Sequence, residues 1–345
     1  MKRVLVTGAN GFIGKNLLVH LAERKGIEVV CFNREHSEAD LPAMLGGVQF
    51  VFHLAGINRP QNPAEFTRGN VGLSEQLAEV MLAIGCKAPV VYTSSIQAEL
   101  DNPYGVSKRA AEDALLALRE KAVPVSVFRL PNVFGKWARP NYNSAVATFC
   151  HNIVNDLPIQ INDPAAVVNL VYIDDVIEHF LALLDAKRMG EAFETVQPVY
   201  QITVGELAEQ LYRFRDSRQS LMTEPVGTGL VRALYSTYLS YVPKERFSYE
   251  VPKYGDPRGV FVEMLKTPDA GQFSFFTAHP GITRGGHYHH TKTEKFLVIK
   301  GKASFKFRHM HTGEFYELET TGEKPEIVET MPGWTHDITN IGDDE

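Results

Sequence analysis

Residues 4–14 read VLVTGANGFIG, and this stretch decides the fold of the first half of the chain. Val4–Thr7 is a short apolar run, which leads into a loop with three glycines and then into a segment with helical spacing of leucines. Such a loop lets the backbone approach a pyrophosphate, whose charge is stabilised by free N–H groups and the positive helix end. A plain strand-to-helix turn is the alternative, but the predicted strand before the loop and the predicted helix after it favour a dinucleotide site. The expected binding residues are Gly8, Asn10, Gly11, Phe12, Ile13 and Gly14.

From residue 1 to about 240, short apolar runs alternate with longer stretches of helical period. This alternation is typical of an α/β fold, in which helices cover a doubly wound parallel sheet. The candidate strands are Val4–Thr7, Glu28–Phe32, Phe50–Leu54, Val90–Thr93 and Pro124–Arg129, and the candidate helices include Gly14–Arg24, Asn70–Ile84 and Pro103–Lys121.

The composition and hydrophobic pattern of the sequence change after Val242. Residues 244–259 read KERFSYEVPKYGDPRG, and the remainder of the chain has the pattern of short strands broken by turns, with almost no helical period. We therefore predict a domain boundary near Pro243, with an α/β domain over residues 1–243 and an all-β domain over residues 244–345.

Composition excludes several classes of protein. The 345 residues carry 35 Lys plus Arg against 41 Asp plus Glu, a net charge of −6, which makes generic nucleic-acid binding a poor prediction. No segment approaches the ~20 apolar residues that a membrane-spanning helix needs, and the first apolar run is too short for a secretory signal. The three cysteines, Cys31, Cys86 and Cys150, are widely spaced and fit reduced thiols. We expect a cytoplasmic protein with neither a nucleic-acid nor a membrane partner.

The end of the second predicted strand bears on the choice of cofactor. An acidic residue there would bind the ribose hydroxyls of NAD, but the chain has Asn33 and Arg34 instead. A guanidinium suits a 2′-phosphate, so these two residues favour NADP(H), although Arg34 beside Glu35 also fits an ordinary solvated charge. After the third strand, Leu54, Ala55 and Gly56 leave room for the adenine or ribose, or are simply small residues at a strand end.

Ser95, Tyr104 and Lys108 form a candidate catalytic set. Ser95 follows an apolar strand, while Tyr104 and Lys108 lie four residues apart, which places them on one face of a helix. A nearby ammonium is expected to lower the pKa of the phenol, making Tyr104 a usable proton donor to an alkoxide, while Ser95 would bind the substrate carbonyl. A Tyr and a Lys at this spacing are often just a solvated face, but the serine and the glycine loop favour catalysis.

Residues 1 to about 240 resemble the extended short-chain dehydrogenases/reductases. The matching motifs are TGANGFIG, HLAG, YTSS, the Tyr104/Lys108 pair and RLPNVFG, and the family's fold is of the Rossmann type. The resemblance implies that Ser95, Tyr104 and Lys108 are catalytic, that Lys108 also holds the nicotinamide ribose, and that Pro131 and Val133 lie near the nicotinamide. Ser94 is the alternative to Ser95. Only eight residues separate Ser95 from Tyr104, fewer than is usual in the family, which should widen the substrate entrance.

The second half contains a candidate metal site. In an extended strand, His287 and His289 point to one face, Glu294 can reach that face from the next strand, and His336 can close the site. Three imidazoles and a carboxylate suit a divalent transition metal, with zinc the first choice and nickel, iron and manganese as alternatives. A polar histidine-rich loop is the other interpretation, and His290 is a substitute ligand if the register differs.

The spacings G-x5-H-x-H-x4-E-x6-G and P-G-x2-H-x3-N resemble the two halves of the cupin pattern, so residues 244–345 are expected to form a jelly-roll. A cupin normally needs at least one more strand after the second motif, and we therefore expect a truncated form. Residues 254–263 and 284–287 also resemble sugar 3,5-epimerases, in which the histidine at the position of His287 is the base. A histidine bound to metal cannot accept a proton, and we favour ligation because Glu294 and His336 then have a purpose.

Taken as a whole, the chain resembles the CapF-type bifunctional enzymes of capsular polysaccharide biosynthesis. The resemblance implies a homodimer that acts on a UDP-linked 4-keto-6-deoxy-N-acetylhexosamine. The cupin would epimerise carbon 3 and the reductase would reduce carbon 4 with NADPH, giving UDP-2-acetamido-2,6-dideoxy-L-talose on the route to UDP-N-acetyl-L-fucosamine. Two other hypotheses remain: a monofunctional 4-keto-sugar reductase with a structural or dimerising cupin, and an NADPH-sensing protein without turnover.

Overall fold

A computed structural model describes residues 1–60, 62, 64–186 and 191–345. The chain divides into two compact units. The first unit contains Met1–Arg215 and Pro225–Phe247, and the second contains Asp216–Glu224 and Ser248–Glu345.

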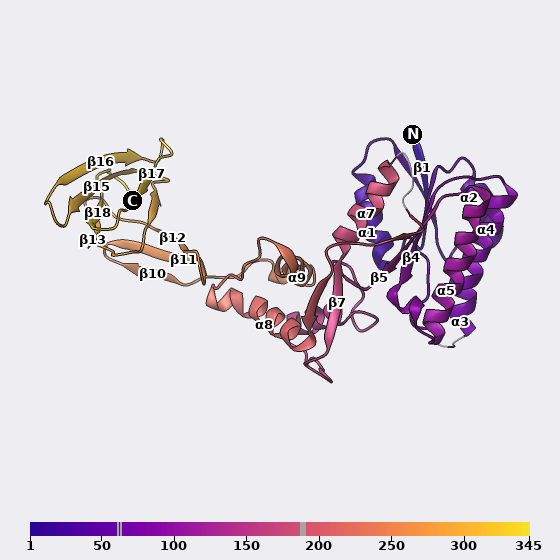
Figure 1. The fold of residues 1–345 in the computed structure, drawn as a ribbon. Coiled ribbons are helices and arrows are strands. Elements are labelled where there is room, and N and C mark those ends of the chain that lie inside the picture. Colours follow the sequence, from indigo (N-terminus) through magenta and orange to yellow (C-terminus); the bar gives the residue numbers. More distant parts are fainter. Residues whose placement is uncertain (61, 63, 187–190) are drawn as a thin grey trace. The chain divides into compact units, whose positions relative to one another are not determined.

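The first unit contains a six-stranded parallel sheet (Figure 1). Its strands are β1 (Lys2–Thr7), β2 (Ile27–Phe32), β3 (Phe50–His53), β4 (Val90–Ser95), β5 (Val125–Leu130) and β8 (Phe193–Glu194). Their order in the sheet is β2-β1-β3-β4-β5-β8. The chain runs from β1 to one neighbour and then returns to the other side of β1, so the order of the strands reverses between β1 and β3. Ligands of doubly wound sheets bind at the carboxyl end of such a switch point.

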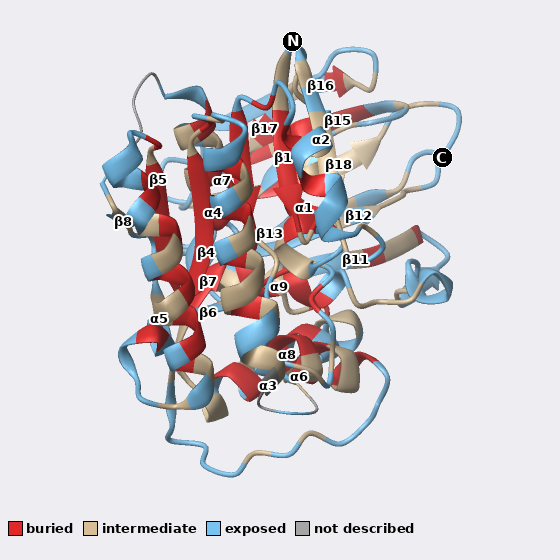
Figure 2. Ribbon diagram, turned by 90° about the vertical axis from the view of Figure 1, so that its right-hand side faces the viewer, coloured by how far each residue is buried: buried red, intermediate tan, exposed pale blue. Residues whose placement is uncertain are grey.

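Helices cover both faces of this sheet, as Figure 1 shows for α1 and α7 on one side and α4 and α5 on the other. Helices cover both faces because both faces of the sheet are apolar. In β1, for example, Val4 and Val6 pack in one apolar cluster and Leu5 packs in another. The four central strands β1, β3, β4 and β5 are accordingly buried along most of their length, whereas the edge strands β2 and β8 are largely not (Figure 2). The predicted doubly wound fold is confirmed. The helices are α1 (Phe12–Ala22), α2 (Leu41–Leu45), α3 (Ala64–Phe66), α4 (Leu73–Ala83), α5 (Pro103–Leu116), α6 (Ala145–Val154), α7 (Ile173–Asp185), α8 (Val204–Ser220) and α9 (Gly229–Leu239).

A smaller sheet of the first unit has the order β6-β7-β9. It consists of β6 (Asn132–Phe134), β7 (Val167–Tyr172) and β9 (Tyr200–Thr203). No helix in the described part of the chain is both long and apolar enough to cross a membrane.

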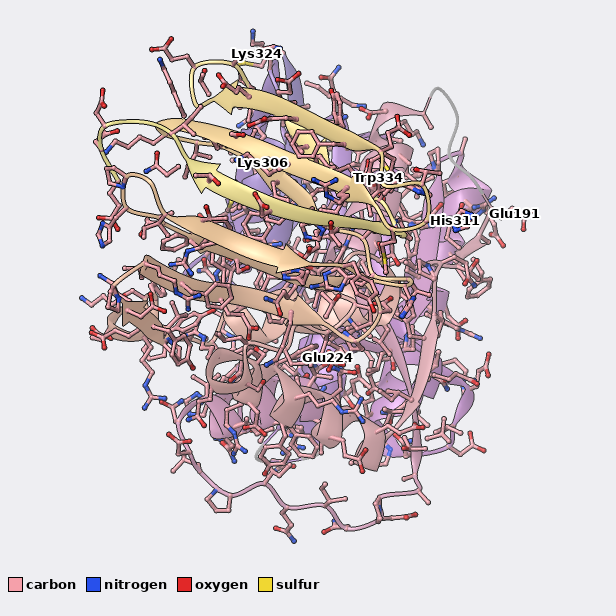
Figure 3. The ribbon with its side chains drawn as sticks, turned by 90° about the vertical axis from the view of Figure 1, so that its left-hand side faces the viewer. Glu191, Glu224, Lys306, His311, Lys324 and Trp334 are labelled. Atoms are coloured by element: carbon pink, nitrogen blue, oxygen red, sulfur yellow. The ribbon has the colours of Figure 1, made fainter. Side chains whose placement is uncertain are left out.

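Residues 248–345 of the second unit form antiparallel strands, which confirms the predicted all-β half. Its sheets have the orders β10-β11-β12, β13-β18-β15-β16 and β14-β17. The strands are β10 (Lys253–Asp256), β11 (Gly259–Thr267), β12 (Gly271–Phe276), β13 (Thr283–His287), β14 (Lys295–Leu297), β15 (Lys302–His309), β16 (Phe315–Thr321), β17 (Ile327–Glu329) and β18 (Trp334–Asn340). Figure 3 shows the four-stranded sheet with Lys306 on β15 and Trp334 at the start of β18. Its inner face packs around Phe305 and Phe307.

Candidate functional site

The glycine loop between β1 and α1 is sterically closed to larger residues. Gly8 has φ +68°, and a Cβ there would lie 2.7 Å from the Cα of Ala55. A Cβ on Gly14 would lie 2.5 Å from the carbonyl oxygen of Gly8. The turn closes with a 2.9 Å hydrogen bond from the N–H of Gly11 to that same carbonyl. No side chain caps α1 among the described residues, so its first-turn N–H groups remain available to an anion at the switch point.

The loops after β2 and β3 meet this turn. Asn33 accepts a hydrogen bond at Oδ1 from the N–H of Asn10, at 3.2 Å, while Arg34 is exposed and forms no ion pair with the described residues. After β3, the N–H of Ala55 donates to the hydroxyl of Thr7 at 3.2 Å. A Cβ on Gly56 would lie 3.2 Å from Nζ of Lys108. The structure therefore brings the predicted cofactor residues of three loops to one edge of the sheet, and the last loop adjoins the Lys108 side chain.

Helix α5 presents Tyr104 at the carboxyl end of β4. Its first turn is fixed by Asn102, whose side-chain oxygen accepts the N–H of Gly105 at 2.8 Å, in an N-cap. The phenol donates to Oδ1 of Asn58 at 3.2 Å. Burial raises the pKa of Tyr104, the hydroxyl of Ser95 lowers it in part, and the phenol of Tyr142 raises it again. The expectation of a lowered pKa is wrong for the structure, because burial raises the pKa of Tyr104 and the Ser95 hydroxyl offsets this only in part.

The Lys108 ammonium is buried beneath the end of β4. Its Nζ donates to the carbonyl oxygen of Thr93 at 3.0 Å and to the hydroxyl of Tyr92 at 3.3 Å. Burial lowers the pKa of Lys108 to about 8, and the Glu112 carboxylate counteracts this effect. Lys108 is therefore largely protonated at neutral pH, and its proton is easier to remove than that of a free lysine.

The two serines of the YTSS motif face in different directions. Ser94 is buried and donates to Oε1 of Glu112, whereas Ser95 caps the next turn by accepting the N–H of Gln97 at 3.2 Å and lies beside Tyr104. Glu112 is also bound by Arg129, whose Nη2 lies 2.6 Å from Oε2. The geometry therefore favours Ser95 over Ser94 as the serine that meets a substrate.

Sequence reasoning missed a buried hydrogen-bond chain behind this site. Nδ1 of His53 accepts from the hydroxyl of Thr7 at 2.7 Å, and Nε2 donates to the hydroxyl of Ser74 at 2.9 Å. Ser74 in turn donates to the carbonyl of Asn70, whose side-chain amide donates to Ser107 at 3.0 Å. Burial lowers the pKa of His53 to about 3, so its ring is neutral. Thr7 and His53 begin the TGANGFIG and HLAG motifs, but the other residues of this hydrogen-bond chain belong to no motif from which it could have been predicted.

Two further predicted residues follow β5. Leu130 pairs with Ser95 in the sheet, so the half-buried Pro131 follows directly beside the serine, and Val133 lies on β6, paired with Val171. The phenol of Tyr142, which acts electrostatically on Tyr104, was not predicted. Its only sequence signal is its place in the loop that follows the RLPNVFG motif.

The four predicted metal ligands of the second unit come together. The ligand atoms of His287, His289, Glu294 and His336 all lie within 4.8 Å of one another. Oε2 of Glu294 is 3.2 Å from Nε2 of His336, 3.3 Å from Nε2 of His289 and 4.0 Å from Nε2 of His287. His290 is outside this group.

Local backbone geometry explains the convergence. His287 pairs with His336 across β13 and β18, so their side chains share one face of the sheet. The register shifts between Gly285 and His287, where Gly285 and Gly286 have φ of +94° and +77°, values that suit glycine. Glu294 is held by a 2.9 Å hydrogen bond from its N–H to the hydroxyl of Thr330.

The donor set fits a divalent transition metal. Nε2 of His336 is buried without a hydrogen-bond partner, although it lies close to the Glu294 carboxylate. Burial and the neighbouring His287 lower the pKa of His336, which favours the neutral ring that metal binding requires. Burial of Glu294 opposes ionisation, but Lys292 overcomes this effect and lowers the pKa of the carboxyl group. A buried nitrogen lone pair and an ionised carboxylate are ligands that such a metal accepts.

Comparisons with known proteins agree with this architecture. The profile of the NAD dependent epimerase/dehydratase family matches residues 4–197, and that of the polysaccharide biosynthesis C-terminal domain matches residues 254–345. A reductase of Pseudomonas aeruginosa, named UDP-2-acetamido-2,6-beta-L-arabino-hexul-4-ose reductase, is 65% identical over 99% of this chain and 92% of its own length.

Two solved structures illustrate the range of similarity. The capsular polysaccharide assembling protein CapF from Staphylococcus aureus has a TM-score of 0.90 and 40% identity, covering 99% of this chain and 93% of that one. The UDP-glucuronic acid 4-epimerase from Bacillus cereus has a TM-score of 0.59 and 20% identity, covering 70% of this chain and 98% of its own, a likeness of fold alone. The chain thus belongs to the NAD dependent epimerase/dehydratase family and, by its similarity over nearly the full length, to the CapF-type capsular polysaccharide enzymes.

Proposed function

We propose that the first unit reduces the 4-keto group of a UDP-linked 4-keto-6-deoxy-N-acetylhexosamine with NADPH. The observation that carries the proposal is the grouping of Ser95, Tyr104 and Lys108 beside the glycine loop. The 65% identical relative from Pseudomonas aeruginosa is named as a hexul-4-ose reductase, which supports this substrate class.

The chain's own residues have distinct roles in this reduction. NADPH, when bound, supplies the hydride that turns the ketone into an alkoxide. Ser95 donates a hydrogen bond to the carbonyl oxygen, and Tyr104 delivers its phenolic proton to the developing alkoxide. Lys108 would hold the nicotinamide ribose, and because its ammonium is mostly charged at neutral pH it would also stabilise the phenolate that remains.

A preference for NADP(H) over NAD(H) follows from the end of β2. Arg34 is exposed and forms no ion pair within the described residues, so its guanidinium is available to a 2′-phosphate. Asn33, held against Asn10, occupies the position where an acid would bind the ribose hydroxyls of NAD.

For the second unit we propose epimerisation at carbon 3, with zinc as the metal held by His287, His289, Glu294 and His336. The ion would supply a Lewis acid for the 4-keto oxygen, which makes the adjacent carbon more acidic. His287 is then a ligand, and the base is another group. We also propose a homodimer, because β12 exposes Phe273 and Phe275 on one face of the sheet β10-β11-β12.

The reductase proposal is tested with Tyr104→Phe. NADPH oxidation with the UDP-4-keto sugar should fall by about 100-fold or more, the usual contribution of a general acid. Tyr249→Phe removes an exposed phenol and serves as the control, since it should retain the wild-type rate. A Tyr104→Phe enzyme that oxidises NADPH at the normal rate would refute the catalytic role and leave the NADPH-sensing alternative.

The epimerase proposal is tested without NADPH. The keto sugar incubated in deuterated water should take up deuterium at carbon 3, and His336→Ala should lose both the metal and this exchange. His290→Ala, from outside the cluster, should keep them. Unchanged exchange in the metal-free protein would contradict a metal-dependent reaction and favour a monofunctional reductase with a structural cupin.

A further inference from the structure

Arg284 of β13 lies on the same face of the sheet as the metal cluster. It pairs with Ile338, and His287 pairs with His336, so the two pairs stand two residues apart along β18. Alternate residues of a strand share a face, and opposite residues of an antiparallel pair share it as well. Ile338 packs against the apolar core of the unit, which identifies this as the inner face. The separation of the two pairs is about 7 Å at roughly 3.4 Å per residue.

Arg284 is half-buried, and one edge of its guanidinium has no partner in the described part of the chain. Its Nε and Nη2 atoms are inaccessible to solvent and have no hydrogen-bond partner, and its Cζ lies 5.4 Å from the centre of the Phe276 ring. Arginine cannot shed its proton, so two unpaired N–H groups on one edge of the cation are costly unless something binds them. Among the described residues no carboxylate forms an ion pair with Arg284. The acid that influences it, Asp256, is held at both oxygens by Arg258.

We propose that Arg284 binds the diphosphate of the nucleotide sugar in the second unit, an inference that rests on the proposed function. Nε and Nη2 form the edge of the guanidinium that matches two oxygens of a phosphate. In the proposed substrate the ketone, the hydroxyls, the acetamido group and the uracil are neutral at pH 7, so the diphosphate is its only charged group. The Arg284 side chain starts two residues along the sheet from the paired His287 and His336. With the diphosphate bound to this cation, the sugar would be oriented with its ketone toward the two histidines.

The test is the number of UDP molecules bound per chain, measured by calorimetry in saturating NADP+ so that the cofactor site is already filled. Wild type should bind two equivalents, one in each unit. Arg284→Met should bind one, with the second weakened by about 10- to 100-fold, as expected for the loss of charge-assisted hydrogen bonds. Arg284→Lys, which keeps the charge without the planar edge, should lie between the two. Arg308→Met is the matched control, since Arg308 also stacks on a phenyl ring but lies exposed on β15.

Metal content and circular dichroism of each variant show whether the second unit remains folded, and Arg284→Lys carries the test if Arg284→Met does not fold. Two equivalents bound by Arg284→Met with wild-type affinity overturn the inference, as does a wild-type chain that binds one equivalent. If Arg284→Met binds two equivalents but exchanges deuterium more slowly at saturating substrate, the guanidinium serves the enolate and not the diphosphate. A wild-type chain that neither binds UDP nor oxidises NADPH with the keto sugar fails the proposed function itself.

Discussion

The Arg129 guanidinium pairs with two acids, the buried Glu112 and the exposed Glu99. Replacing each acid by alanine should therefore have very different effects on the stability of the first unit. Arg129 approaches Glu112 to 2.6 Å and Glu99 to 3.1 Å. The Glu112 side chain is 1% exposed, whereas that of Glu99 is 69% exposed. The two variants therefore compare the loss of a buried and of a solvated partner at one cation.

The expected magnitudes follow from burial. Removing one partner of a buried ion pair typically costs 3–5 kcal/mol, because the other charge stays buried and unpaired. Arg129 is itself partly exposed and keeps Glu99, so Glu112→Ala should reduce the free energy of unfolding by about 3 kcal/mol, near the lower end of that range. Glu99→Ala should cost at most about 1 kcal/mol, the usual limit for an exposed pair. Glu112→Gln, which retains an acceptor for Ser94, should lie between them.

Urea unfolding provides the assay, because the chain has two tryptophans, Trp137 in the first unit and Trp334 in the second. In a Trp334→Phe background, fluorescence reports the first unit alone. Midpoints and slopes of the unfolding curves then give the free energy for each variant. If Glu112→Ala and Glu99→Ala differ by less than about 1 kcal/mol, the argument from burial is wrong for this site.

Three other perturbations have definite expected results. Burial lowers the pKa of His53 to about 3, below the ~6.5 of an unfolded histidine, so stability should fall by up to about 1.4 kcal/mol per pH unit from pH ~6.5 toward 3. Denaturation curves of His53→Asn should lack this part of the slope, and an unchanged slope would contradict it. Gly14→Ala, whose Cβ would meet backbone at 2.5 Å, should destabilise the first unit by about 1–3 kcal/mol and weaken NADPH binding in a fluorescence titration, whereas Gly227→Ala, in open space, should do neither. Because burial lowers the pKa of Lys108 to about 8, kcat/KM for the keto sugar should decline above that pH as the ammonium loses its proton, and a profile flat to pH 10 would argue against its role.

The sequence predicts the architecture of the first unit because local and global signals agree. The apolar runs at Val4–Thr7 and Phe50–Leu54 lie within two residues of β1 and β3 at each end, and the glycine loop lies where a strand passes into a helix. No pattern in the sequence predicts that Asp216–Glu224 belongs to the second unit. There the contact is a backbone bridge between Met222 and Lys266, and a backbone hydrogen bond does not depend on the side chains that a pattern displays.

The candidate sites divide in the same way. The four metal ligands were predictable because strand pairing converts a fixed spacing into a shared face, and His287 and His336 pair directly. The direction in which the Lys108 ammonium points could not be predicted. The four-residue spacing relates Lys108 to Tyr104 on the same helix, but its Nζ donates to the carbonyl oxygen of Thr93, which lies on β4. The choice between Ser94 and Ser95 depended on Glu112, an acid that lies 18 residues after Ser94 and is drawn inward by Arg129.

The proposed chemistry also fixes the order in which the two sites act. Carbon 3 exchanges its proton only while carbon 4 is a ketone, because the ketone stabilises the enolate that forms. Reduction at Tyr104 removes that ketone, so any sugar that reaches the first unit before the second can no longer be inverted. Product made in deuterated water should then carry deuterium at carbon 3 in proportion to its inversion. Limiting the metal while NADPH is in excess should give a reduced sugar without inversion and without deuterium, whereas deuterium in a sugar of unchanged configuration would mean that proton removal and inversion are separate events.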